Sequence, residues 1–264
     1  MWVNAAIEQL KKEVIAIIGP QTSDVAEFVS HMGDAANVPI VSVSATSPLL
    51  SSHRFPYFVR VAHSDALQMK AIAAVVETYG WRRIVVIYPD NDFGSGAISS
   101  LCDALRDVDS EIEHRSPIPL TASREEIREE LYKLNNMQSR VFVAHMNPAL
   151  GLDLFAEAHA IGMIEAGYVW ITTDGLTSLL DVLLNSSTMA SMQGLIGIKS
   201  HVPTSDRLSN FTQRWKREFR MENPEEEKAE LNIYGLLAYD AVQMVAQAIG
   251  RLGSNASLHF LDPS

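Results

Sequence analysis

Short apolar runs alternate with amphipathic segments along most of the chain. The runs, such as residues 84–88 and 168–171, are rich in β-branched and aromatic residues, which is typical of strands covered on both faces. The segments between them repeat apolar residues at helical spacing. Strands that alternate with helices predict an α/β fold with mostly parallel sheets flanked by helices.

The first strand-and-helix unit covers residues 14–23. Its apolar run stops at Gly19-Pro20, so we expect a strand buried on both faces, followed by a helix that Thr22 or Ser23 caps. Unpaired N–H groups gather where a strand's carboxyl end meets the start of a helix, and anionic groups of ligands bind there in open α/β sheets. A plain strand-turn-helix link with a capping hydroxyl explains the same pattern.

Three further polar groups follow predicted strands or precede helices. Ser44 and Thr46 stand two residues apart in an extended segment, so they can face one spot, although turn hydroxyls also bond to their own backbone. Asp65 precedes a long amphipathic helix and is most simply its N-cap. Asp174 follows the strand at 168–171, where α/β ligand sites lie, or is a turn residue before glycine.

Length and charge narrow the class of protein. The 264 residues suffice for two lobes with cores of their own. The net charge of −11 argues against a nucleic-acid partner, which needs a basic face. No run approaches the length of a membrane helix, and no signal peptide is visible. Because a stub of helix precedes the first predicted strand, we expect this chain to be a fragment that lacks an upstream strand.

Cysteine and glycosylation patterns indicate opposite compartments. The single cysteine, Cys102, excludes an internal disulfide and favours a reducing compartment. Three Asn-x-Ser/Thr sequons, at Asn185, Asn210 and Asn255, favour a secreted setting and are predicted glycosylation sites.

Signatures of catalysis are missing from the sequence. It contains no nucleophile elbow, phosphate loop or dinucleotide fingerprint, and no Cys/His cluster with zinc spacing. The acids of residues 89–96 lack the spacing of a calcium loop. Cys102 has no obvious activating partner, so a structural thiol is the simpler interpretation. We therefore predict that the protein has no catalytic residue, cofactor or metal, and that it is not an enzyme.

Several short motifs stand in a particular order and spacing along the chain. They are Ile17-Ile18-Gly19-Pro20-Gln21-Thr22-Ser23, Val38-Pro39-Ile40, Ser44-Ala45-Thr46-Ser47-Pro48, Tyr57-Phe58-Val59-Arg60, Tyr79-Gly80-Trp81, Asp92-Phe93-Gly94, Ser139-Arg140-Val141-Phe142-Val143, Gly167-Tyr168-Val169-Trp170-Ile171 and Ala238-Tyr239-Asp240-Ala241-Val242. Their order and spacing resemble the type 1 periplasmic-binding-protein fold, which is the two-lobed extracellular domain of amino-acid and peptide receptors. The chain most closely resembles the amino-terminal domain of plant glutamate-receptor-like channels over nearly all its length.

The resemblance implies a domain organisation. Residues 1–62 and 201–264 would form lobe one, incomplete at its N-terminus, and residues 63–200 would form lobe two. Chain crossings near 62–65 and 198–201 would act as hinges, and a ligand cleft between the lobes would close by hinge motion.

The resemblance also implies site residues. Two groups would hold a zwitterion: Ser23, Ser44, Ala45 and Thr46 at its carboxylate, and Asp65, Phe93 and Asp174 around its ammonium. Two acids in a desolvated cleft fit a cationic amine better than a neutral ligand. Phe93 departs from the commoner tyrosine and offers a ring face without a hydroxyl.

Three functions remain open at this point. The first is a binding module for a small amino acid or related amine, in a ligand-gated cation channel at the extracellular side of the plasma membrane, with other receptor subunits as partners. The second is an assembly domain of the same receptor with an empty cleft. The third is a cytosolic doubly wound enzyme, which predicts unmodified Asn185, Asn210 and Asn255.

Overall fold

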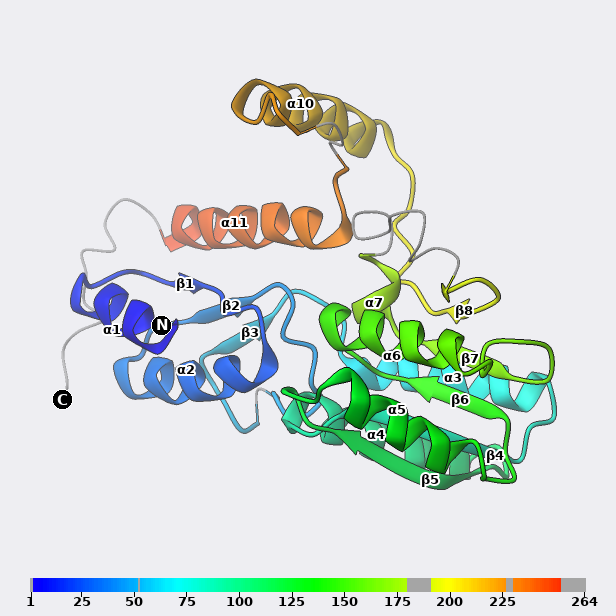
Figure 1. The fold of residues 1–264 in the computed structure, drawn as a ribbon. Helices are drawn as coiled ribbons and strands as arrows, with labels where there is room; N and C mark the ends of the chain where they lie inside the picture. Colours follow the sequence, from blue (N-terminus) through cyan, green and yellow to red (C-terminus); the bar gives the residue numbers. More distant parts are fainter. Residues whose placement is uncertain (1, 52, 180–190, 227–229, 253–264) are drawn as a thin grey trace. The chain divides into compact units, whose positions relative to one another are not determined.

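The computed structural model describes residues 2–51, 53–179, 191–226 and 230–252. These residues form two units, one comprising the chain up to Ser64 together with the part from Ile233 onward, and the other comprising Asp65–Asn232. Each unit contains a parallel sheet flanked by helices (Figure 1), which confirms the predicted α/β class. The lobe limits implied by the resemblance stay a prediction.

The first unit is built on a small sheet of order β1-β2-β3. In the parallel register Ile40 lies between Ile17 and Phe58, and this row packs against Ala26 and Val29 of the following helix. The elements are α1 (Trp2–Lys11), β1 (Ile17–Ile18), α2 (Ser23–Ala36), β2 (Ile40–Ser42), β3 (Phe58–Arg60) and α11 (Ile233–Leu252).

The prediction of a strand buried on both faces at residues 14–18 is wrong. Only Ile17–Ile18 pairs as a strand, and Ile15 and Ile18 are 59% and 45% exposed. The physical reason is its place in the sheet, because within the described residues β1 pairs with β2 alone and forms an edge. Successive strand residues point to opposite faces, so Ile17 reaches the core beside α2 and Ile18 does not.

The second unit is built on a larger parallel sheet of order β5-β4-β6-β7-β8. Its elements are α3 (Asp65–Thr78), β4 (Arg83–Pro89), α4 (Asp92–Arg106), β5 (Glu111–Ile118), α5 (Arg124–Leu134), β6 (Val141–Ala144), α6 (Pro148–Ala160), β7 (Val169–Thr172), α7 (Asp174–Thr177), β8 (Ile196–Gly197) and α10 (Asp206–Glu222).

The central strands of this sheet bury both of their faces. Alternate residues face opposite sides, so Ile87 and Phe142 pack with α5 and α6, whereas Val86 and Val143 pack with α3 and α4. The Trp170 ring stacks on Phe142 with centroids 4.7 Å apart, and its Nε1 donates to the Met163 carbonyl at 2.8 Å. This two-sided core holds the carboxyl ends of the strands, where the candidate site lies.

Polar side chains fix the turns that lead from these strands into helices. Asn91 caps α4 by accepting from the Gly94 N–H at 3.0 Å, and Asn147 caps α6 by accepting from the Leu150 N–H at 2.9 Å. Capping satisfies amide groups that a helix start would otherwise leave without partners. The residues in these turns therefore have defined positions.

Candidate functional site

The first group of predicted site residues lies in the first unit, where the ends of β1 and β2 meet the start of α2. The Ser44 hydroxyl donates to the Gln21 carbonyl at 2.8 Å. The Ser42 hydroxyl donates to the Pro20 carbonyl at 2.7 Å, and its oxygen accepts from the Ala45 N–H at 3.0 Å. These bonds tie together the two loops that the resemblance assigns to a ligand carboxylate.

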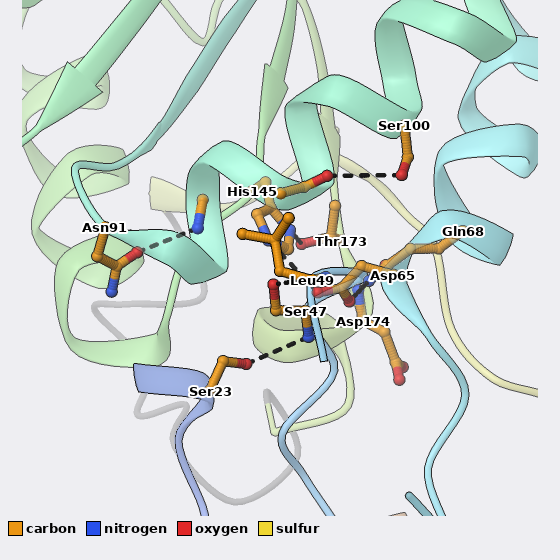
Figure 2. A network of polar contacts seen from close by, with 12 residues as sticks. Ser23, Ser47, Leu49, Asp65, Gln68, Asn91, Ser100, His145, Thr173 and Asp174 are labelled. Carbon is orange, nitrogen blue, oxygen red and sulfur yellow. Dashed lines mark hydrogen bonds and ion pairs between the residues drawn. The ribbon is translucent and has the colours of Figure 1, made fainter. Parts of the chain in front are cut away.

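Ser23 fixes the same two loops rather than capping its helix. The N-cap of α2 is Thr22, whose side chain makes no capping bond. The buried Ser23 oxygen instead accepts from the Ser47 N–H at 3.2 Å (Figure 2). This bond joins the start of α2 to the segment after β2. Ser44 and Thr46 are half-buried and Ala45 is fully buried.

The second group lies in the second unit and begins with Asp65, the first residue of α3, which is 2% exposed. Gln68, one turn later, donates from Nε2 to Asp65 Oδ1 at 2.5 Å. Its Oε1 accepts from the Asp174 N–H at 2.8 Å (Figure 2). Gln68 therefore joins the start of α3 to the start of α7 and restricts the orientation of the Asp65 carboxylate.

His145 follows β6 and is completely buried beside this carboxylate. Its Nδ1 lies 3.0 Å from the Thr173 hydroxyl and its Nε2 lies 3.8 Å from Asp65 Oδ2 (Figure 2). The Phe93 ring packs on the imidazole with centroids 4.1 Å apart and a tilt of 33°. Among the described residues Nε2 has no hydrogen-bond partner.

Burial lowers the pKa of His145 below its ordinary value of 6.5, because desolvation disfavours the charged ring. The Asp65 carboxylate and the Phe93 backbone favour the charged ring but only partly offset this effect. At neutral pH the imidazole is therefore uncharged. The Asp65 carboxyl group therefore faces a neutral ring.

Asp174 has a different environment from Asp65. Its Oδ1 accepts from the Ser178 hydroxyl and from the Ser200 N–H at 3.2 Å, and its Oδ2 accepts from the Ser200 hydroxyl at 3.1 Å. These bonds attach the segment after β8 to α7. The carboxylate therefore has internal partners on both oxygens.

The structure thus brings Asp65 and Phe93 together around His145, and connects Asp174 to them through Gln68. Sequence reasoning missed His145, Thr173 and Gln68. The first two directly follow buried strands, so the rule that ligand sites lie at strand carboxyl ends would have found them. Nothing in the sequence marks Gln68 as a site residue except its position one helical turn after Asp65.

The predicted glycosylation sites and Cys102 do not belong to this group of site residues. Asn210 is exposed on α10, whereas Asn185 and Asn255 lie outside the described residues. Glycosylation stays a prediction. Cys102 is half-buried and accepts from Arg115 Nη2 at 2.8 Å.

Two kinds of feature are absent from the part of the chain that the structure describes. No cluster of three or more His, Cys, Asp or Glu side chains there is arranged to hold a metal ion. In the same residues no helix combines the length and apolar character of a membrane span.

Comparison with known proteins decides the family. Residues 3–262 match the family described as the receptor family ligand binding region. This chain belongs to that receptor family. It is 47% identical to glutamate receptor 2.7 of Arabidopsis thaliana over 93% of its length, and 44% identical to glutamate receptor 2.2 of the same plant over 96%. It spans only 26% and 27% of those two relatives.

The family and these relatives confirm the resemblance to plant glutamate receptors, and with it the expectation that the chain is not an enzyme. The family also agrees with the α/β architecture of the two units.

Proposed function

We propose that this chain is the extracellular ligand-binding and regulatory region of a glutamate-receptor-like cation channel at the plasma membrane, and that it binds a small amino acid between its two lobes. The family match and the plant glutamate receptors support this proposal. Assembly with other receptor subunits is part of the same proposal.

The single observation that carries the proposal is the buried Asp65 carboxylate. A buried carboxylate is costly unless a cation or strong donors compensate it. Gln68 donates to one of the Asp65 oxygens, and the Phe93 ring lies against the neighbouring His145 imidazole. The ammonium of an amino acid pairs with a carboxylate, and an aromatic ring offers a face to the same cation.

The loops of the first unit suit the other end of an amino acid. Ser23 carries a hydroxyl group there, and the amino end of α2 has positive dipole character. We assign the α-carboxylate to Ser23, Ser44, Ala45 and Thr46. We assign the ammonium to Asp65 and Phe93, with Asp174 completing the acidic side while it holds Ser200 in place.

Calorimetric titration of the full-length protein with glycine, L-alanine, L-serine and L-glutamate at pH 7.5 tests the proposal. We expect Asp65→Asn to weaken binding about a hundredfold, because losing one partner of a desolvated charge pair costs roughly 2–5 kcal/mol. Asp103→Asn, which changes an exposed acid of α4, is the matched control and leaves affinity unchanged. Unchanged binding in the Asp65→Ala, Asp174→Ala double variant would disprove the assigned roles.

One observation favours the assembly domain as a second candidate. Both oxygens of Asp174 and one oxygen of Asp65 already have internal donors, so an ammonium competes with existing bonds. If the assembly function is correct, none of the four amino acids produces heat, and sedimentation velocity shows a concentration-dependent oligomer.

A further inference from the structure

The side-chain amide of Gln68 contacts two different elements of the second unit. Its Nε2 donates to Asp65 Oδ1 at 2.5 Å, and its Oε1 accepts from the Asp174 N–H at 2.8 Å (Figure 2). A glutamine amide is a donor at one end and an acceptor at the other, and each end here meets a group of the opposite kind. The two neighbours therefore fix which way the amide is turned.

Both contacts of Gln68 lie where an acid begins a helix. Asp65 is the first residue of α3, and Asp174 is the first residue of α7. The first N–H groups of a helix have no acceptor within it, so the Asp174 N–H needs one from another element. Gln68 supplies this acceptor to a residue that lies 106 positions further along the chain. The amide therefore keeps two helix starts, and the acid that each carries, in one arrangement.

The Asp174 carboxylate extends this series of bonds to the edge of the sheet. Its Oδ1 accepts from the Ser200 N–H at 3.2 Å, and its Oδ2 accepts from the Ser200 hydroxyl at 3.1 Å. Ser200 follows β8, which is the strand at this edge. Hydrogen bonds therefore run from Asp65, the first residue of the second unit, through Gln68 and Asp174 to the segment after β8. A residue without an amide at Gln68 would break the series between the two acids.

We propose that Gln68 is a positioning residue of the ligand site and sets its affinity for amino acids, because its amide holds the Asp65 carboxylate in one orientation and in a fixed relation to Asp174. This role rests on the proposed function, since Gln68 itself is assigned no contact with the ligand. A carboxylate that is already held in place loses less freedom when an ammonium binds, and such preorganisation raises affinity. The amide is neutral, so it orients Asp65 without taking the place of a cation.

Hydrogen exchange in the ligand-free protein, resolved to the Asp174 amide, tests the contact with α7. Gln68→Met has a side chain of similar length without an amide, so we expect the Asp174 amide to exchange about tenfold faster. Gln68→Glu keeps an oxygen that can accept from this amide and should restore most of the protection. Gln213→Met, which changes an exposed glutamine of α10, is the matched control and should leave the rate unchanged. Equal exchange in the wild type and in Gln68→Met would overturn the contact and the role built on it.

Calorimetric titration of the full-length protein with glycine, L-alanine, L-serine and L-glutamate at pH 7.5 measures the effect on affinity. We expect Gln68→Met to weaken binding about tenfold, which is the effect of losing one hydrogen bond to a charged group. The control variant Gln213→Met should bind as the wild type does. Binding by Gln68→Met that matches the wild type would overturn the positioning role.

Removing the group that is positioned separates a positioning role of Gln68 from a general role in folding. In Asp65→Ala there is no carboxylate to hold, so adding Gln68→Met should weaken binding by less than about twofold. The titrations of the Asp65→Ala proteins use correspondingly higher ligand concentrations. If Gln68→Met weakened binding about tenfold in both backgrounds, it would act independently of Asp65, and the positioning role would be overturned.

Failure of the proposed function and failure of the role of Gln68 give different results. Wild-type protein that produces no heat with any of the four amino acids overturns the proposed function, and the role of Gln68 in binding with it. Wild-type binding that Gln68→Met does not change leaves the proposed function standing and overturns the role of Gln68 alone.

Discussion

A fully buried histidine makes folding sensitive to pH. The folded protein holds His145 neutral with a pKa below 6.5, whereas the unfolded chain protonates it near that value. Below about pH 6.5 the unfolded state therefore binds more protons, so the free energy of unfolding decreases as pH falls toward the pKa of the folded state. Above about pH 6.5 this contribution is fully present.

We expect urea midpoints of the full-length protein to decrease between pH 7.5 and pH 5.5, and the decrease to be smaller in His145→Gln. The exposed His159→Gln should retain the wild-type decrease. An equal decrease in all three proteins would show that His145 does not titrate in this way.

Single residues at strand ends were predictable from the sequence only in part. Asp65 and Asp174 were marked by their places at a helix start and a strand end, whereas Phe93 and the roles of all three came from the resemblance. The structure connects them through contacts in the second unit. His145 directly follows β6, so the rule for strand carboxyl ends could have marked it. Gln68 could not be assigned, because a pattern of apolar positions contains no information on which side chains meet across separate elements. The one-turn spacing of Asp65 and Gln68 becomes meaningful only when α7 lies beside them.

Element boundaries depend on neighbours that the sequence pattern does not show. The helix α5 begins at Arg124, where Ser123 and Glu126, three residues apart in the sequence, form a capping box. The five-residue apolar run at 14–18 yields only the two-residue β1, because the sheet edge leaves Ile15 and Ile18 exposed. Local chemistry set the helix start, whereas pairing with neighbouring strands set the extent of the strand.

The first turn of α4 lies so close to the end of β4 that it requires a glycine at Gly94, which gives a prediction at the scale of elements. A methyl group on Gly94 would overlap the Pro89 carbonyl oxygen and approach Tyr88 Cδ2 at 2.8 Å. We expect Gly94→Ala to lower the free energy of unfolding by about 2 kcal/mol, since backbone cannot move aside as a flexible side chain does. Urea unfolding measures the change.

Gly175→Ala is the control in the same unit. A methyl group there meets nothing closer than 3.4 Å, so the change should be neutral or stabilise by up to about 1 kcal/mol. If Gly94→Ala and Gly175→Ala lowered the free energy of unfolding equally, the contact with Pro89 would not be the cause of the loss in Gly94→Ala.

At the scale of the whole molecule, the chain has a separate core in each unit. In the second unit Trp170 stacks on Phe142 and meets Phe155 edge to face, and in the first unit Phe55 packs with Ile40 and Phe58. Each core is contained in one sheet and its own helices. A cavity in one core should therefore destabilise its own unit more than the other.

Hydrogen exchange of the full-length protein can measure this independence unit by unit. Trp170→Ala should reduce protection across β4, β6 and β7, with a loss of about 3–5 kcal/mol, and leave β2 and β3 near wild type. Phe55→Ala should produce the reverse pattern. If either variant lowered protection equally in both units, the chain would unfold as one cooperative body. The outcome in which each variant affects its own unit would show that the core of one unit keeps its packing when the other core is disrupted.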